Sequence, residues 1–389
     1  MEIKAILLIG GEAGSNSGTS AQTLARTPVA LVDVLGKPVV LRVAERLKKQ
    51  GVTSVAVISE SPLPPLSAVA RAELAQLSWT EASGAQFWRV AESIFEQLQS
   101  GTDEILVMRL GGYAEFDLDS FLQHHIDDRY HHVTRAHLPS GEALDVFLVT
   151  AARRNEAAFL FRHQLQQTRS ACGSWECRGY WNPLANAHDL RRMAVDGLLR
   201  RSELQPVGEQ RRPGIWVARG ARIHKRARVL APAFIGERAT ICAAAVVTRC
   251  GVVEHHSEIS SGTVIEDATV LPFTRVGASL DISHAVASAR CVLHLRRNVE
   301  VEVTDSRLLD AVSSSAPLRA LENAVSLAAF LPAHFLRGLF ARSHREQPAK
   351  FPAESTAGAL RSVPSGFEAS SEASSFPANM AVARRYGNQ

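Results

Sequence analysis

Aliphatic residues recur at every sixth position through the middle of this 389-residue chain, and that period limits the folds it can adopt. The ten positions are Val217, Ile223, Val229, Ile235, Ile241, Val247, Val253, Ile259, Ile265 and Leu271. A small residue stands four places after each of the first nine, namely Ala221, Ala227, Ala233, Ala239, Ala245, Gly251, Ser257, Thr263 and Thr269. The spacing predicts a hexapeptide β-helix, in which the aliphatic side chain fills the interior and the small one fits a tight corner.

Three such hexads make one triangular coil, so the nine intervals between the ten positions predict three coils. At about 4.8 Å per coil, the interior would be on the order of 15 Å long. Val276 and Ile282 resume the spacing one residue out of register. We therefore expect a bulge or loop before them, and the remainder to Asp310 has room for another coil.

The first 200 residues or so have a different pattern, in which apolar runs alternate with helical spacing. We expect strands at 4–11, 52–59, 104–110 and 143–149, and helices at 39–50, 85–98, 119–127 and 151–166. The opening strand, helix and strand form the unit that builds a right-handed parallel sheet. The alternation as a whole predicts an α/β layer sandwich.

Composition excludes several classes of protein. With 46% hydrophobic and 21% charged residues, the chain can bury a large core divided into two or three domains. Its 43 Lys and Arg against 39 Asp and Glu leave a formal charge of +4, too small to indicate a nucleic-acid partner. No apolar run is long enough to cross a bilayer, and residues 1–11 do not read as a signal peptide, so we predict a cytoplasmic protein. The five scattered cysteines predict buried thiols rather than a disulfide framework.

The patterns divide the chain into five segments. An α/β domain is expected at 1–204, a linker at 205–213 and the β-helix at 214–310. A helical cap or amphipathic segment is expected at 311–342, and a disordered tail at 343–389, where Ser, Ala, Pro and Glu dominate. The apolar stretch 317–342 has two interpretations: it covers the open end of the coil, or it makes a peripheral contact with a membrane.

Several segments carry a resemblance to a known family. They are Ala5-Ile-Leu-Leu-Ile-Gly-Gly11, Leu31-Val-Asp-Val-Leu-Gly-Lys-Pro-Val-Val40, Glu45-Arg-Leu-Lys-Lys-Gln-Gly51, Phe116-Asp-Leu-Asp119 with His124, and Gly179-Tyr-Trp-Asn-Pro-Leu-Ala-Asn-Ala-His-Asp189. Together with the hexads they resemble the sugar-1-phosphate nucleotidyltransferases, or sugar-nucleotide pyrophosphorylases, which include the mannose-1-phosphate guanylyltransferases. The resemblance covers about 310 residues. It implies a Rossmann-like nucleotidyltransferase layer sandwich followed by a left-handed β-helix.

The resemblance implies a nucleotide site at the glycines that follow the first and central strands, which here are Gly10, Gly11, Gly14 and Gly111. The family's charged groups are not matched. Its Gly-rich loop carries an arginine that is absent here, and its Pro-Lys-Pro-Leu segment corresponds to Pro28-Val-Ala-Leu31, with Arg26 two residues upstream. Its two magnesium-binding aspartates correspond to Leu110-Gly-Gly-Tyr113 and to Pro183, with Ala185 at the position of the family's glycine. We therefore predict no catalytic residue and no metal ligand.

Three functions follow as hypotheses. The first is a catalytically degenerate, nucleotidyltransferase-like protein of sugar-nucleotide or cell-envelope polysaccharide biosynthesis, acting as a regulatory or assembly subunit. The second is an active enzyme that recruits Mg²⁺ through Glu115, Asp117 or Asp119. The third is a hexapeptide acyltransferase with a histidine base among His255, His256 and His284. The close histidines His124, His125, His131 and His132 are expected to be a solvated helix end rather than a metal site.

The partners expected from these hypotheses are few. The ligand would be a nucleotide or an NDP-sugar, with Mg²⁺ as a cofactor only for the active enzyme. The chain would form a homo-oligomer or pair with an active relative, as a repetitive coil surface permits. No nucleic acid is expected.

Overall fold

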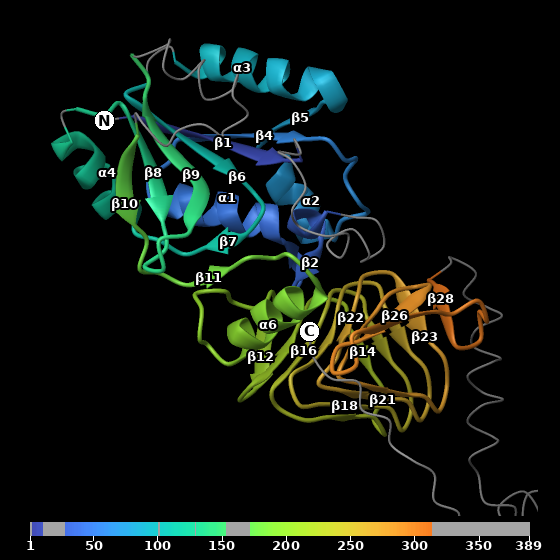
Figure 1. The fold of residues 1–389 in the computed structure, drawn as a ribbon. Helices are drawn as coiled ribbons and strands as arrows, with labels where there is room; N and C mark the ends of the chain where they lie inside the picture. Colours follow the sequence, from blue (N-terminus) through green and yellow to red (C-terminus); the bar gives the residue numbers. More distant parts are fainter. Residues whose placement is uncertain (1, 11–27, 100–101, 129, 153–171, 313–389) are drawn as a thin grey trace, which may run out of the picture. The chain divides into compact units, whose positions relative to one another are not determined.

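The structure is a computed structural model that describes residues 2–10, 28–99, 102–128, 130–152 and 172–312. It is a mixed α/β chain with parallel sheets (Figure 1). The predicted segments 317–342 and 343–389 and most of the predicted helix 151–166 lie outside the described residues, as do Gly11, Gly14 and Arg26. No helix in these ranges is long and apolar enough to cross a membrane.

A seven-stranded sheet occupies the N-terminal part of the chain, with the order β10-β8-β9-β6-β1-β4-β5. The strands are β1 (Ile3–Ile9), β4 (Ser54–Ser59), β5 (Ser78–Glu81), β6 (Glu104–Arg109), β8 (Val133–His137), β9 (Ala143–Thr150) and β10 (Gly173–Glu176). β1 pairs in parallel with β4, as predicted, and also with β6. β9 runs antiparallel to both of its neighbours, which makes the sheet mixed.

Helices cover both faces of this sheet (Figure 1). These helices are α1 (Val39–Lys49), α2 (Ala68–Leu74), α3 (Phe87–Leu98) and α4 (Leu118–Asp127). A further helix, α6 (Ala187–Leu198), lies away from this sheet and contacts residues 250–269 through Arg191. Alternate residues of a strand point to opposite faces. Leu7 of β1 therefore joins the core formed with α1, and Leu8 joins the core formed with Phe87 and Phe95 of α3. The sequence predicted α1, α3 and α4 but not α2 or α6.

Residues 215–287, which we call the repeat region, form parallel strands in three sheets. The first sheet contains β13 (Ile215–Val217), β16 (Ala233–Ile235), β19 (Gly251–Val253), β22 (Thr269–Val270) and β25 (Ala285–Ala287). The second contains β14 (Arg222–Ile223), β17 (Thr240–Ile241), β20 (Glu258–Ile259) and β23 (Thr274–Val276). The third contains β15 (Arg228–Val229), β18 (Val246–Thr248), β21 (Val264–Glu266) and β24 (Asp281–Ser283).

Strands that stand three hexads apart in the sequence pair with one another in parallel. Ile223 pairs with Ile241, which pairs with Ile259, and these side chains belong to one hydrophobic cluster with the aliphatic residues of the other two sheets. Most predicted small residues are buried as well, Ala239 and Ala245 among them. A stack of short parallel strands therefore encloses a continuous apolar interior.

The tenth predicted position is wrong. Val253 pairs with Val270, which stands one position short of three full hexads, and Val270 rather than Leu271 joins the interior cluster. Leu271 packs instead with the core of the N-terminal sheet. The chain loses one residue between Ile265 and Val270, where Asp267 adopts a left-handed turn conformation. The shift lies before Leu271 rather than after it.

The end of the repeat region also differs from the expected extra coil. After β25 the chain forms β26 (Cys291–His294) and β27 (Val299–Glu302), an antiparallel hairpin on the first sheet. β28 (Leu309–Ala311) then pairs antiparallel with β23. At the other end, β12 (Glu209–Arg212) pairs antiparallel with β13. Antiparallel strands thus border the parallel strands at both ends of the first sheet.

Candidate functional site

Two neighbouring parallel strands, β1 and β6, end at the same edge of the seven-stranded sheet. Gly10 follows β1 directly, and Gly111 lies two residues after β6. The structure therefore brings together these two of the four predicted nucleotide-site glycines, while Gly11 and Gly14 fall outside the described residues. Ligands of α/β sheets bind beyond the carboxyl ends of the strands, so this edge is the first candidate site.

The segment after β6 is apolar and closely packed. Leu110 is buried, and a Cβ added to Gly112 would clash with the ring of Trp181. Trp181 belongs to β11 (Trp181–Asn182), which pairs antiparallel with β7 (Tyr113–Ala114). A Cβ on Gly111 would meet nothing within 4 Å. An indole ring therefore covers one glycine of this strand end, and the other glycine faces open space.

This difference gives a prediction about the two adjacent glycines. Gly112→Ala is expected to lower the free energy of unfolding by about 1–3 kcal/mol, because the new methyl group forces the Trp181 ring to move. Gly111→Ala, the matched control, is expected to change it by less than about 0.5 kcal/mol. Urea denaturation of both variants measures the effect, and equal losses in the two would contradict the packing described above.

The second segment at which the resemblance implies a metal-binding carboxylate follows β11. Pro183 comes directly after this strand, and the buried Asn182 is held by its own hydrogen bonds. Its Nδ2 donates to the carbonyl oxygen of Asp189 at 2.9 Å, and its Oδ1 accepts from the backbone N–H of Leu184 at 3.0 Å. Within the described ranges, no three His, Cys, Asp or Glu side chains are placed to hold a metal ion.

Charged side chains do lie at the carboxyl end of β6, but they pair with one another. Asp145, at the start of β9, is 2.7 Å from Nη2 of Arg135 and 3.8 Å from Nη1 of Arg109. Arg135 also donates to the carbonyl oxygen of Leu144 at 2.8 Å and lies over the ring of Phe147. Sequence analysis missed this cluster because antiparallel pairing of β9 brings it together. Two guanidinium groups and one carboxylate leave one net positive charge.

Two of the three substitute ligands of the active-enzyme hypothesis, Glu115 and Asp117, are engaged in local structure. Glu115 is buried and accepts hydrogen bonds from the backbone N–H of Glu203 at 2.9 and 3.0 Å and from the Tyr113 hydroxyl at 3.1 Å. Burial raises the pKa of Glu115, although these hydrogen bonds oppose the shift. Asp117 caps the N-terminus of α4 by accepting from the backbone N–H of Asp119. These carboxylates stabilise the fold around α4.

The four histidines near α4 do not converge. His124 Nε2 lies 3.0 Å from the carbonyl oxygen of Ser174, and His125 Nδ1 lies 2.6 Å from the hydroxyl of Thr134. His131 Nδ1 lies 2.8 Å from a carboxylate oxygen of Asp128. Each of these three rings has its own partner. The predicted solvated helix end is wrong for His125, which is buried with its Nε2 3.2 Å from a carboxylate oxygen of Glu104.

The histidines of the repeat region differ in their surroundings. His284 Nδ1 lies 2.5 Å from Oδ2 of Asp267, and both residues stand at turns of the coil. His256 is half-buried, and its ring stacks on Phe273 with the centroids 5.0 Å apart. His255 is fully buried, which excludes it as an exposed base. Of these three histidines, His284 alone retains the geometry of a carboxylate-oriented imidazole that solvent can reach.

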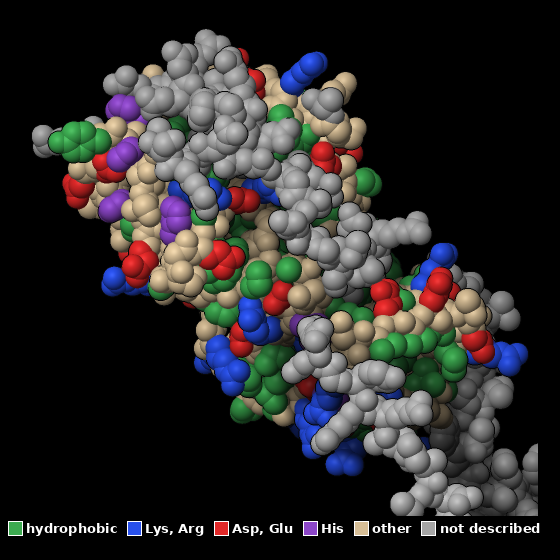
Figure 2. Space-filling view, viewed as in Figure 1, with side chains coloured by type: hydrophobic (Ala, Val, Ile, Leu, Met, Phe, Trp, Pro, Cys, Tyr) green, Lys and Arg blue, Asp and Glu red, His purple; other side chains and the backbone are tan. Residues whose placement is uncertain are grey.

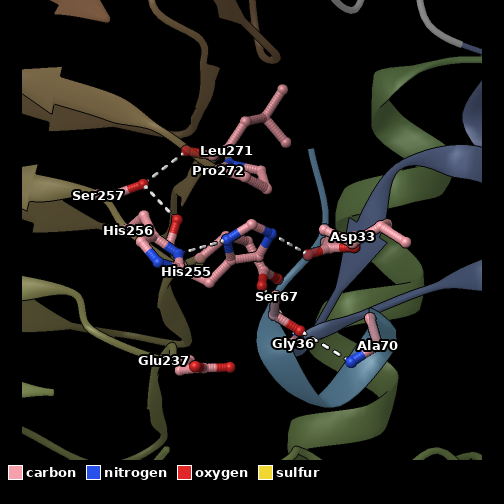
Figure 3. A network of polar contacts seen from close by, with 12 residues as sticks. Asp33, Gly36, Ser67, Ala70, Glu237, His255, His256, Ser257, Leu271 and Pro272 are labelled. Carbon is pink, nitrogen blue, oxygen red and sulfur yellow. Dashed lines mark hydrogen bonds and ion pairs between the residues drawn. The ribbon is translucent and has the colours of Figure 1, made fainter. Parts of the chain in front are cut away.

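A buried polar cluster joins the repeat region to the N-terminal part of the chain (Figure 3). His255 Nε2 lies 2.7 Å from Oδ2 of Asp33, which stands on β2 (Asp33–Val34), and both residues are buried. On its other side, His255 Nδ1 lies 3.0 Å from Nδ1 of His256. Sequence analysis missed this contact because its members come from distant parts of the chain.

Glu254 and Arg42 extend this cluster. The Glu254 carboxylate accepts hydrogen bonds from the backbone N–H groups of Leu35 at 2.7 Å and Gly36 at 2.9 Å. Arg42 of α1 donates to the carbonyl oxygens of Val34 and Leu35, which belong to the same segment that Glu254 binds. The hairpin between β2 and β3 (Lys37–Pro38) is therefore held from both regions.

Burial raises the pKa of the Glu254 carboxyl, and the negative charge of Asp33 raises it further, to about 8. The two backbone hydrogen bonds and the positive charge of Arg42 act in the opposite direction but do not outweigh burial. Burial also lowers the pKa of Arg42. We interpret the cluster as the structural junction of the two regions, because its polar groups are buried and lie against one another.

A cavity of about 330 Å³ lies next to α1 and the segment 203–208. Its lining includes the cations Lys37, Arg42, Arg46 and Lys49. Lys37 and Lys49 each lie 2.9 Å from the carboxylate of Glu45, and Arg46 pairs with Glu203. Each of these cations already has a partner, in Glu45, in Glu203 or in the backbone carbonyls that Arg42 contacts, although the lining has two more cations than carboxylates.

Comparison with known proteins adds no assignment. A scan against protein-family models finds no match for this chain, and a search of the curated proteins finds none either. The functional conclusion therefore depends on the geometry of the strand ends, the repeat region and their charges.

Proposed function

We propose that this chain is a nucleotidyltransferase-like protein of sugar-nucleotide or cell-envelope polysaccharide metabolism that acts as a regulatory or assembly subunit without catalysis. Its architecture is proposed to be a Rossmann-like layer sandwich followed by a left-handed β-helix of hexapeptide repeats. The seven-stranded sheet with helices on both faces supports the first part. The pairing of strands three hexads apart in three sheets supports the second.

One observation carries the loss of catalysis: the strand end where a metal-binding carboxylate is expected has an open Gly111 and a Gly112 covered by Trp181. Nucleotidyl transfer from a nucleoside triphosphate to a sugar 1-phosphate, with pyrophosphate as the leaving group, relies on positioning and on neutralising phosphate charge. Losing a single charge-stabilising group typically costs about 10²–10³ in rate. Here the carboxylate is missing after β6, and Pro183 stands at the second position.

A residual ligand site is part of the proposal. Gly10 and Gly111 lie at one sheet edge, and the Arg109, Arg135 and Asp145 cluster beside it has one net positive charge. These features support weak binding of a nucleotide or an NDP-sugar without a metal ion. The repetitive outer faces of the coil support association with a second copy or with an active relative.

The test is an assay of the purified full-length protein with Mg²⁺, nucleoside triphosphates and sugar 1-phosphates, in which pyrophosphate is measured. We expect no release of pyrophosphate above the protein-free control. Calorimetric titration of nucleotides with and without Mg²⁺ is expected to show weak binding that the metal does not change. Turnover in any combination, or tight binding that requires Mg²⁺, would show that the chain is an active enzyme and overturn the proposal.

A second candidate function rests on the contact between His284 and Asp267. A carboxylate that holds Nδ1 of an imidazole orients its Nε2 as a general base, the arrangement that acyl transfer to a hydroxyl or amine requires. Acetyl transfer from a thioester donor, lost in His284→Gln and retained in His256→Gln, would favour this hexapeptide acyltransferase alternative over the leading proposal.

A further inference from the structure

The first coil of the repeat region carries an unusual concentration of positive charge. Between residues 209 and 228 there are seven Lys and Arg residues and one acid, Glu209. The seven cations, which we call the basic ring, are Arg211, Arg212, Arg219, Arg222, Lys225, Arg226 and Arg228. All seven are exposed. Lys and Arg side chains gather along the border of the repeat region near β12 in Figure 2.

These charges are not neutralised by the neighbouring coil. None of the seven forms an ion pair with an acidic side chain in the part of the chain that the structure describes. Arg222 is paired along the sheet with Thr240, and Arg228 with Val246, so the next coil places uncharged residues beside them. These like charges repel one another, but the fold keeps them close together, and their sum is a local positive potential.

The coil geometry distributes these cations around the end of the stack. Arg211 and Arg212 lie on β12 beside the first sheet, Arg222 lies on β14 in the second sheet and Arg228 on β15 in the third. Arg219, Lys225 and Arg226 occupy the turns between these strands. The basic ring therefore surrounds one end of the repeat region instead of following one face.

The end that the ring surrounds is partly apolar. β14 and β15 are the outermost strands of their sheets, so the first coil has no coil beyond it there in the described part of the chain. Ile223 and Val229, whose counterparts in later coils are fully buried, are only half-buried here. Leu230 beside them is 43% exposed. An apolar centre within a ring of cations is an amphipathic end face.

We propose that this end face binds the surface of an anionic lipid bilayer. A bilayer is a plane, so it reaches cations on all three sides of the coil at once, and it accepts apolar side chains at its interface. A nucleic-acid duplex lies along a line, and the aromatic side chain of this coil, Trp216, packs into the core instead of offering a stacking surface. A second copy facing the same end would bring two basic rings together and be repelled. The inference is independent of the proposed function.

The experiment is co-sedimentation of the full-length protein with phosphatidylcholine vesicles that contain or lack phosphatidylserine. We expect binding only to the anionic vesicles, and a loss of binding as salt is raised, because exposed charges are screened. The triple variant Arg222→Glu, Lys225→Glu, Arg228→Glu is expected to bind at least about ten-fold more weakly. A matched control, Arg89→Glu, Arg200→Glu, Arg297→Glu, makes the same change of charge at exposed positions outside the ring and is expected to retain most of the binding.

Circular dichroism and urea denaturation establish that both triple variants fold. Equal binding by the wild type and the ring variant would overturn the proposal and assign the contact to another segment, such as 317–342. Equal weakening in both triple variants would attribute the binding to net charge alone and also overturn it. So would binding to an oligonucleotide duplex without vesicle binding, or a dimer that the ring variant abolishes without vesicle binding.

Discussion

Replacing His255 by alanine is expected to lower the free energy of unfolding by about 3–5 kcal/mol. The substitution leaves the Asp33 carboxylate buried without the ring that lies 2.7 Å from it. Glu254 is also fully buried; it precedes His255 in the sequence and lies next to Asp33 in space. Water cannot reach an unpaired carboxylate in this position, so the free-energy cost of removing it from water is not offset by any new contact.

Urea denaturation followed by tryptophan fluorescence measures this loss. His256→Ala is the matched control, because this ring is half-buried and stacks on Phe273, and we expect a loss of about 1 kcal/mol. Adding Asp33→Asn to His255→Ala removes the stranded charge and is expected to recover a large part of the stability. A loss below about 1 kcal/mol in His255→Ala would contradict the structural role of this contact.

The pH dependence of stability is expected to report on Glu254. Its ordinary pKa of 4.5 is raised in the folded protein to about 8, first by burial and then by the charge of Asp33. Between these values the folded chain holds a proton that the unfolded chain has released. Stability therefore falls as pH rises through this window, and the contribution is complete below it and lost above it. Over the whole window the fall from this group is about 3–5 kcal/mol.

Unfolding of the wild type and of Glu254→Gln at a series of pH values isolates this contribution from that of the other titrating groups. The amide cannot ionise, so the stability advantage of the wild type over the variant is expected to shrink as pH rises from about 5 to 8. Glu209→Gln, at an exposed position on β12, is the control and is expected to follow the wild-type curve. Parallel curves for the wild type and Glu254→Gln would show that the carboxyl does not titrate in this range.

Both predictions concern the junction between the two regions of the chain, and they bear on its proposed role. A subunit without catalysis acts through the surfaces that it presents. Those surfaces are held in register by the contacts of Asp33, Glu254 and Arg42. Weakening the junction is therefore expected to change how the sheet edge and the repeat region are presented together.

The period of the repeat region can be read from the amino-acid sequence alone. One side chain of every short strand must fill a narrow interior, and only an aliphatic residue at each sixth position satisfies that requirement. The resemblance indicated Gly10 and Gly111 as residues after the first and central strands, and the structure shows that these strands, β1 and β6, are neighbours. Helix α1 could also be predicted from the sequence, because its apolar residues recur at helical spacing.

The position at which the register changes became visible only in the folded chain. Val270 and Leu271 are both aliphatic, so the spacing alone does not distinguish which one enters the interior, and the turn at Asp267 selects Val270. The antiparallel direction of β9, and with it the pairing of Asp145 to Arg109 and Arg135, likewise depends on how strands align in the sheet.

The junction and the basic ring also depend on how folding brings residues together. Asp33 and His255 are distant in sequence, and no local pattern couples them. The seven cations are close in sequence, but the formal charge of +4 over the whole chain conceals them. Only the arrangement of the short strands in three sheets distributes them around one end. Periodicity is a local property that a chain displays in its sequence, whereas charge contacts and surfaces depend on distances that folding alone creates.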